Sequence, residues 1–448
     1  MFATIKQIFK PTNKDLRNRL LFTLGILFIF KIGTVIRIPG TENLTDNLGF
    51  LELINAMGGG ALKQFSIFAL GVMPYITASI IIELLSMDIV PYLSELNKQG
   101  YTGRQKKNQI TRYIGIIFAF AQGIAFSFAF LGNGVGVMEY LRVATIMTAG
   151  TAFLLWLGDQ ITQKGIGNGI SLIIMAGILA TIPTMFIDAF NELVKFTSTQ
   201  AIFIGIISFL VFVIVYLLIV VGVIFVQEAE RRLPIQYANR TTSSYGGQQT
   251  YMPLRINSAG VIPVIFASSV IAIPATIAQF VKNEGFTLFV NKYLNYNTVP
   301  GFTLYIVLIL FFAYFYVFLQ INPEQLSEDL QKNGGYIPGI KPGKETCKYI
   351  KQVLSRLTIV GAVFLAVIAG LPILFTNLSK LPSSITIGGT GLLIVVGVAL
   401  ETYKQLESSL VSRNYKRTNY QRRSRKAKWE ISYLSRPLQL VKVLKLKF

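Results

Sequence analysis

Residues Phe65 to Glu83, FSIFALGVMPYITASIIIE, decide the fold because part of this stretch occurs twice in the chain. GVMPYITAS at 71–79 matches GVIPVIFAS at 260–268 at six of nine positions. Both copies are apolar, and both carry a proline early, at Pro74 and Pro263. An apolar helix that recurs in corresponding halves of a chain is typical of an internally duplicated membrane protein. The shared proline position argues against a chance match between two apolar helices.

The composition also indicates a membrane protein. Of the 448 residues, 52% are hydrophobic and 14% are charged, and the mean hydropathy is +0.54. Ordinary soluble domains have about 25% charged residues. A chain with so little polar surface needs lipid as its solvent. Its net charge of +21 indicates either an excess of Lys and Arg on the cytoplasmic side or a surface for an acidic partner such as ribosomal RNA.

Several classes of chemistry are excluded by the absence of particular residue types. The chain has no histidine, which removes Ser–His hydrolysis, histidine metal ligands and histidine proton relays. Its single cysteine, Cys347, cannot form a disulfide framework or a Cys-rich metal site. No GxxxxGK[ST] loop for ATP is present. We therefore expect no enzyme activity, no metal and no cofactor.

Apolar runs of about 20 residues, the length that crosses a bilayer, predict ten spanning helices. We expect five in an N-terminal half, 1–195, and five in a C-terminal half, 196–403, followed by a basic tail at 404–448. The loops assigned to one face hold 32 Lys and Arg, and those on the other face hold seven. The positive-inside rule then places both termini in the cytoplasm. The predicted spans are 20–38, 71–88, 110–131, 143–162, 170–188, 201–226, 258–281, 301–320, 356–375 and 384–403.

Residues 49–64, GFLELINAMGGGALKQ, are apolar but too short to span and are interrupted by three glycines. Non-helical backbone at membrane depth survives when it is buried in protein or lines a cavity. The stretch therefore fits a re-entrant segment inside a channel, although a surface loop with an amphipathic turn fits it too.

Two long loops on the basic face are candidate docking surfaces, since partners often bind loops that a rigid scaffold holds. In 227–255, the alternation at 235–237 and the pair Gly246-Gly247 predict a β-hairpin. In 321–355, several glycines and prolines lie close together in the basic tip of the loop, at 334–343. Both loops could instead be solvated connectors.

Among the few ionisable residues within the predicted spans are Lys31, Glu83, Asp159 and Glu401. The three acids lie near cytoplasmic helix ends, and Lys31 could reach the interface. No pair is suited to ion coordination at mid-membrane. The absence of such a pair argues against one possible function, the transport of a small solute by a secondary transporter, which would need ion coordination at mid-membrane. An intramembrane hydrolase, the third possibility, would need a paired nucleophile and base, and a chain with no histidine and a single loop cysteine fits this poorly.

Pairs of β-branched residues one turn apart recur in the spans: Val72 with Ile76, Val261 with Ile265, and Ile170 with Ile174. Ile394 lies near the start of the last span. A ring of such side chains could close a pore by dewetting, without fixed ligands. The same pattern also fits ordinary helix packing, which the residues alone favour.

Five long blocks of sequence resemble the bacterial SecY family, and the resemblance runs from about residue 15 to 417. It implies a channel for proteins, all-α, with ten transmembrane helices in two pseudo-symmetric halves around a central pore. The blocks are GGALKQFSIFALGVMPYITASIII, TAGTAFLLWLGDQITQKGIGNGISLII, AGVIPVIFASS, NPEQLSEDLQKNGGYIPGIKPG and GGTGLLIVVGVALETYKQLES.

The resemblance also implies roles for particular residues. The helices at 71–88 and 258–281 would form the lateral gate, with Pro74, Thr77, Gln122, Asn257 and Pro263 in it. The implied pore ring is Val72, Ile76, Ile170, Ile174, Ile265 and Ile394. The implied plug is about 50–64, with Phe50, Leu51, Leu53, Ile54, Met57, Gly58, Gly59 and Gly60. The implied partner-binding loop residues are Arg231, Arg232, Arg240, Lys341 and Lys344.

Some positions depart from the family pattern. Lys341 stands where an arginine is usual, and lysine keeps the charge but loses the planar fork. Asn239 replaces a common lysine, and Glu83 replaces a common glutamine. After about Tyr415 the resemblance stops, and the tail carries a dense basic run at 422–428. That tail could be solvated, or it could bind anionic lipid or ribosomal RNA.

The function that the resemblance implies is passage of unfolded polypeptides across the plasma membrane and release of apolar segments into lipid through the lateral gate. The expected partners are the small membrane subunits SecE and SecG, the ATPase SecA and the ribosome. Signal sequences, unfolded polypeptides and membrane lipid complete the expected set.

Overall fold

The computed structural model describes residues 14–41, 55, 58–86, 89–131, 136–195, 199–237, 250–281, 284–295, 298–379 and 391–410. Within these residues, seven helices are long and apolar enough to cross a membrane. Two shorter apolar helices and a last helix at 391–410 complete the set, so a helix lies at each of the ten predicted positions. The labelled helices at these positions are α2 (Lys14–Val35), α4 (Met73–Leu85), α6 (Gly100–Phe130), α7 (Val137–Lys164), α8 (Gly169–Leu193), α9 (Thr199–Glu228), α10 (Ile262–Val281), α12 (Val299–Gln320) and α14 (Lys344–Ser379).

The predicted loops contain more helix than expected. Helix α5 (Pro91–Lys98) and the first turns of α6 occupy the basic loop at 89–109, and α11 (Glu284–Tyr293) precedes α12. Helix α13 (Pro323–Lys332) begins where the Asn322 side chain accepts hydrogen bonds from the backbone N–H groups of Glu324 and Gln325, at 3.0 and 3.4 Å. An asparagine cap followed by proline is a strong helix start. A search for apolar spans misses such short polar helices.

A small antiparallel sheet confirms the predicted hairpin. Strand β1 (Glu230–Tyr237) pairs with β2 (Thr250–Arg255) from Glu230 opposite Arg255 to Ile235 opposite Thr250. The short β3 (Gly335–Tyr336) adds to the other edge of β1. Leu233, Ile235 and Leu254 bury their side chains against Leu330, Ile350 and Leu354 of α13 and α14. The sheet is therefore a platform with its own apolar core.

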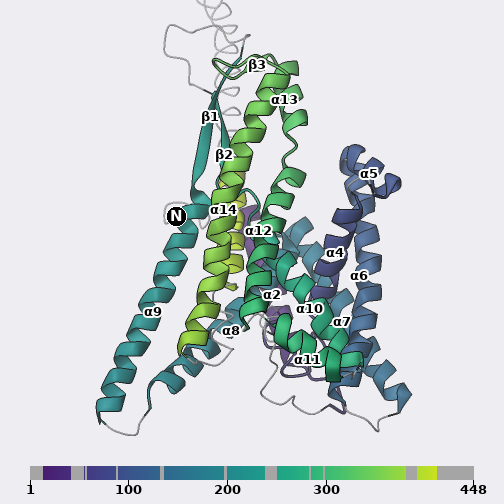
Figure 1. Cartoon of the computed structure of the whole chain (residues 1–448). Helices are drawn as coiled ribbons and strands as arrows, with labels where there is room; N and C mark the ends of the chain where they lie inside the picture. The colour runs from purple at the N-terminus through teal and green to yellow at the C-terminus, as the bar shows by residue number, and fades with distance from the viewer. Residues whose placement is uncertain are drawn as a thin grey trace, which may run out of the picture.

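Figure 1 shows α5, β3 and α13 at one end of the bundle and α11 at the other end. Segments from two of the predicted basic loops, 89–109 and 321–355, thus lie at the same end. This arrangement agrees with the charge alternation along the sequence.

One hydrophobic cluster fills the centre of the bundle and includes residues from both predicted halves, for example Phe30, Leu154, Leu365 and Leu393. The outer surface is also apolar. Along α9, Phe203, Leu218 and Phe225 are 68%, 64% and 76% exposed. A helix that is apolar on every side and still exposed requires a lipid environment. The chain is a multi-pass membrane protein.

Candidate functional site

The two repeated segments have the same backbone conformation at their starts. Gly71 and Gly260 both have positive φ, +58° and +64°, which glycine adopts without a steric penalty. The N–H of Gly71 donates to the carbonyl of Phe68 at 2.8 Å, and the N–H of Gly260 donates to Asn257 at 3.4 Å. Each helix then has its proline as second residue, where the fixed φ favours a first turn. The two segments therefore share their backbone conformation as well as their sequence.

A cavity of about 370 Å³ lies between α4, α6 and α10. Its inner side is bounded by Leu70 and Met73, which are buried in the central cluster. Its outer side is bounded by Ile273 and Ile277, whose side chains are 42% and 45% exposed. The cavity therefore connects the centre of the bundle with the surface that faces lipid.

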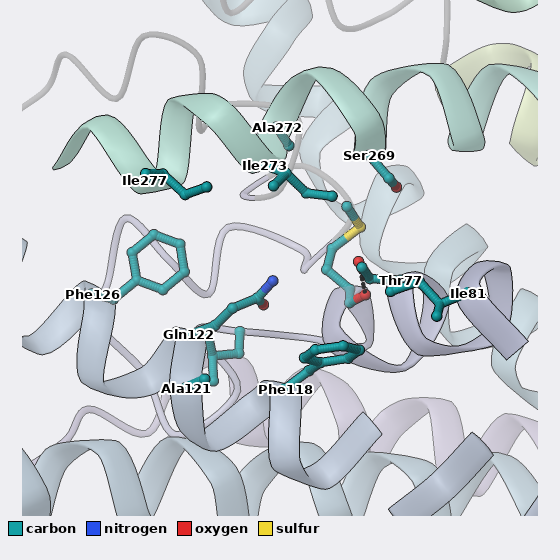
Figure 2. Close-up of a pocket in the computed structure, with 12 residues that line it drawn as sticks. Thr77, Ile81, Phe118, Ala121, Gln122, Phe126, Ser269, Ala272, Ile273 and Ile277 are labelled. Carbon is teal, nitrogen blue, oxygen red and sulfur yellow. Dashed lines mark hydrogen bonds between the residues drawn. The ribbon is translucent and has the colours of Figure 1, made fainter. Parts of the chain in front are cut away.

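The lining is apolar apart from three side chains. Thr77 lies on α4, Gln122 on α6 and Ser269 on α10, and Figure 2 shows Gln122 pointing toward α10 and Ser269 pointing into the cavity. The Thr77 hydroxyl donates to the Met73 carbonyl within its own helix at 3.2 Å. Thr77 and Gln122 were expected from the resemblance, whereas Ser269 was not.

Asn257, the third polar residue expected at the gate, lies outside the lining of this cavity. It is 6% exposed, and its amide Nδ2 donates to the Gly260 carbonyl at 3.1 Å. This bond closes the turn that leads into α10. Pro74 and Pro263 are also buried at their helix starts. These three residues shape the backbone of the repeat.

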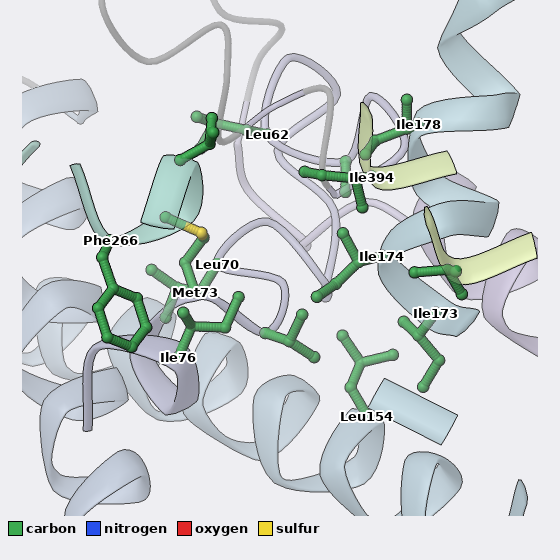
Figure 3. Packing of buried hydrophobic residues seen from close by; sticks show 14 of the residues in the cluster. Leu62, Leu70, Met73, Ile76, Leu154, Ile173, Ile174, Ile178, Phe266 and Ile394 are labelled. Atoms are coloured by element: carbon green, nitrogen blue, oxygen red, sulfur yellow. The ribbon is translucent and has the colours of Figure 1, made fainter. Parts of the chain in front are cut away.

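The six residues expected to form a ring belong to one apolar cluster. Val72, Ile76, Ile174 and Ile394 are buried in it, and Ile170 and Ile265 pack against it. Figure 3 shows Ile76, Ile174 and Ile394 around the same region of the core, beside Leu62. Ile170 also lies close to Gly158 of α7. All six therefore belong to the central core, which draws on helices far apart in the sequence.

Of the residues expected in the plug, Phe50, Leu51, Leu53, Ile54 and Met57 lie outside the described residues. The described part of this region, 58–72, is non-helical and mostly buried. It includes the expected Gly58, Gly59 and Gly60. This burial favours a re-entrant segment over a surface loop.

Three contacts hold the re-entrant segment against the helices. Gly59, at φ +72°, approaches α8 so closely that an added Cβ would lie 3.3 Å from the Cα of Gly177. The N–H of Ile38 donates to the Phe65 carbonyl at 3.1 Å. The Thr151 hydroxyl of α7 donates to the Gly71 carbonyl, also at 3.1 Å. The segment is thus fixed at both ends and runs directly into α4.

Comparison with known proteins decides the family. The SecY family profile matches residues 66–403. The chain belongs to the SecY family. A protein translocase subunit SecY of Staphylococcus epidermidis is 50% identical over 429 residues, which cover 93% of this chain and 99% of the relative. The corresponding subunit of Bacillus licheniformis is 49% identical over 437 residues, with the same coverage of both chains.

Solved structures of SecY-like channels share the fold. The structure described as "a protein conducting channel" has a TM-score of 0.63 at 19% identity and covers 88% of this chain and 92% of its own. Sec61 in a canine ribosome-channel complex has a TM-score of 0.60 at 19% identity, with the same coverage. The fold is therefore that of these channels, and the helices that the structure describes are consistent with the ten-helix arrangement expected.

The basic loop residues of this SecY chain lie on the sheet platform and beside it. Arg232 forms an ion pair with Glu230 at 2.9 Å, and its guanidinium lies 4.7 Å from the ring centroid of Tyr251. The hydrogen bond with Glu230 raises the pKa of Arg232. Arg231 lies on the same strand and is exposed. Lys341, just before α14, and Lys344, the first residue of α14, are exposed as well. Arg240 and Asn239 lie outside the described residues.

Two of the four ionisable residues noted in the spans have ion-pair partners. Glu83 of α4 pairs with Lys107 of α6 at 2.8 Å, and Asp159 of α7 pairs with Arg112 of α6 at 2.7 Å. Glu401 and Lys31 are exposed. Among the residues that the structure describes, no group of three or more acidic or Cys side chains could hold a metal ion. The Glu83 pair was missed from sequence because the partner lies on another helix.

Proposed function

We propose that this SecY chain conducts unfolded polypeptides through its centre and releases apolar segments sideways between α4 and α10. The observation that carries the proposal is the cavity between these two helices, which connects buried Leu70 and Met73 with the exposed Ile273 and Ile277. An apolar segment that entered there would exchange contacts with the core for contacts with lipid. Both environments are apolar, so this exchange has little desolvation penalty.

The central seal is proposed to be the ring of Val72, Ile76, Ile170, Ile174, Ile265 and Ile394. Aliphatic side chains at a constriction exclude water and ions without binding a particular ligand. They can also part around chains of different sequence. The segment 50–64 is proposed to plug the same path at rest, and its glycines give the tight turns that such a segment needs.

Energy for transport is proposed to come from partners, with no covalent chemistry in this chain. SecA and the ribosome are the proposed partners for the basic loop residues Arg231, Arg232, Arg240, Lys341 and Lys344. Positive surfaces attract acidic proteins and ribosomal RNA. SecE and SecG are proposed to clamp the helices within the membrane. A known Sec61 channel bound to a ribosome is consistent with this choice.

The chain is proposed to lie in the plasma membrane with both termini in the cytoplasm. The charge difference between the two sets of loops supports this orientation. We also propose that 1–195 and 196–403 act as two halves that separate at the gate, with 404–448 as a cytoplasmic tail. The shared backbone at Gly71 and Gly260 supports this division.

Reconstitution tests the function. Liposomes that contain the full chain with SecE, SecG, SecA and ATP should take up an unfolded precursor with an apolar signal segment and exclude small solutes. The matched control replaces the signal segment by a polar one of equal length. Uptake of a small solute without any uptake of precursor would favour the transporter alternative. The ion pairs of Glu83 and Asp159 argue against that alternative, because they leave those carboxylates neutralised.

A further inference from the structure

Ser269 differs from the other serines of its helix region in having a buried hydroxyl without a partner. The residue is 3% exposed, and its Oγ has no hydrogen-bond partner among the described residues. The neighbouring Ser268 donates to the carbonyls of Val264 and Ile265, at 2.6 and 3.2 Å. A serine in a helix commonly donates to the carbonyl four residues earlier. For Ser269 that carbonyl belongs to Ile265, which receives the Ser268 hydroxyl instead.

The orphan hydroxyl faces the cavity between α4, α6 and α10 (Figure 2). The other two polar side chains of the lining are Thr77, whose hydroxyl donates to the Met73 carbonyl, and Gln122, and neither is hydrogen-bonded to Ser269. Buried hydroxyl groups nearly always have a partner, because an unpaired one loses its bond to water. An unpaired hydroxyl that faces an apolar cavity is typical of a site whose partner arrives with a ligand.

We propose that Ser269 is a specificity-determining residue of the gate, which hydrogen-bonds to a polar side chain carried by the apolar segment that enters between α4 and α10. This inference rests on the proposed function. A serine hydroxyl can donate to an amide carbonyl or accept from another hydroxyl. A segment with one threonine, serine or glutamine at this depth would therefore keep that group paired. Ser269 widens the set of accepted segments beyond those that are wholly aliphatic.

Export of matched precursors tests this proposal in liposomes that contain the full chain and its partners. Each precursor carries an apolar signal segment with either valine or threonine, which have nearly the same shape, at one of four successive positions. The four positions cover one helical turn, so one of them faces Ser269. The measured quantity is the ratio of threonine to valine export, which a general loss of folded protein leaves unchanged.

Ser269→Ala is expected to lower this ratio at one position by about fivefold, the factor that one hydrogen bond contributes. Ser268→Ala is the matched control and should leave the ratio unchanged, since its hydroxyl is satisfied within the helix. Ser269→Thr retains a hydroxyl and should retain the ratio. An unchanged ratio in Ser269→Ala at all four positions would overturn the role of Ser269 while valine export still supports the channel. Failure of the parent to export any precursor would overturn the proposed function and this inference with it.

Discussion

Helices α4 and α10 begin with the same backbone turn but are held in different ways. Helix α4 packs closely on α6, where an added Cβ on Gly115 would lie 3.2 Å from the Cα of Tyr75. At its other end, Glu83 pairs with Lys107 of α6 at 2.8 Å. Close packing and an ion pair thus join α4 to its own half of the chain.

Helix α10 has no ion pair of this kind. Its sequence contains no charged residue, and Pro274 interrupts its hydrogen bonding. Ser269 faces the cavity without a partner, and Ile273 is 42% exposed. The comparison indicates that α4 and α6 form one wall of the proposed gate, and that α10 forms the opposite wall without an ion pair. Separation should therefore occur along α10.

The largest effect is expected from a covalent bond across the gate. Thr77→Cys with Ile273→Cys, in a Cys347→Ser background, joins α4 to α10 across the cavity that both residues line. A disulfide there should abolish export, and reduction or a long flexible crosslinker should restore it. Export of radiolabelled precursor into liposomes is the measurement.

A crosslink within one wall provides the control. Thr77→Cys with Gln122→Cys joins α4 to α6, which we expect to move together, so export should continue. Full export with a verified short bond between α4 and α10 would contradict a gate at this place.

The next effect concerns Ile76 and Ile265, which occupy equivalent positions in the repeat. Ile76 is 9% exposed, whereas Ile265 is half-buried. Asparagine at position 76 should reduce folded protein, because a buried unpaired amide costs about 1–3 kcal/mol. Asparagine at 265 should reduce it less. If both belong to a ring, each variant raises resting ion conductance per molecule.

Conductance and protein level must be measured together for this pair. Ile76→Leu and Ile265→Leu serve as controls and should leave both quantities near the parent values. Lower protein level without excess conductance per molecule would mean that these side chains stabilise the core but do not seal a pore, which would contradict the ring.

The repeat could be predicted from sequence because glycine and proline act directly on the backbone. Gly71 and Gly260 permit the same positive φ, and Pro74 and Pro263 fix φ in the first turn of each helix. The spans followed equally directly from runs of apolar residues. The positions of the helices and the repeat between the two halves could therefore be predicted largely from local sequence.

The rest could not be predicted because it depends on which helices become neighbours. Glu83 and Lys107 lie on separate helices, so their pairing has no local signal. A serine in an apolar helix usually donates a hydrogen bond within that helix, and only the three-dimensional structure shows that Ser269 is unpaired. Helix α13 is different, because the Asn322-Pro323 start was a signal that a search for long apolar runs overlooked.

A smaller effect should come from the two turn glycines. Gly71→Ala and Gly260→Ala each place a side chain at positive φ, which costs about 1 kcal/mol. Because both turns have the same conformation, the two melting temperatures in detergent should fall equally. Side chains larger than alanine should lower the melting temperature by different amounts at the two sites.

Gly71→Val meets the re-entrant segment, since even a Cβ there lies 3.7 Å from the Cα of Gly58. Gly260→Val has no described atom within 4 Å of the added Cβ. The valine variant at 71 should therefore melt lower than the one at 260. Equal melting of the valine pair, or unequal melting of the alanine pair, would contradict this account of the repeat.

The smallest effect concerns the ion pair that joins α4 to α6. The side chains of Glu83 and Lys107 are 28% and 14% exposed, so solvent screens the pair only in part. Glu83→Gln keeps a hydrogen-bond acceptor and should lower the free energy of unfolding by about 0.5–1 kcal/mol. A double-mutant cycle with Lys107→Met isolates the pair from the separate effect of each residue.

The cycle also tests whether α4 is the anchored wall. A coupling energy of about 0.5–1 kcal/mol in unfolding would show that the pair fixes α4 to α6. Loosening that wall should then let precursors with weakly apolar signals pass more readily, because less apolar contact is needed to part the helices. Lys332, which pairs with Glu328 on exposed α13 at 3.3 Å, supplies the control pair. Its removal should change neither quantity, since exposed pairs contribute little. Zero coupling between Glu83 and Lys107 would mean that the ion pair does not fix α4 to α6, and the difference between the two walls would then rest on packing at Gly115 alone.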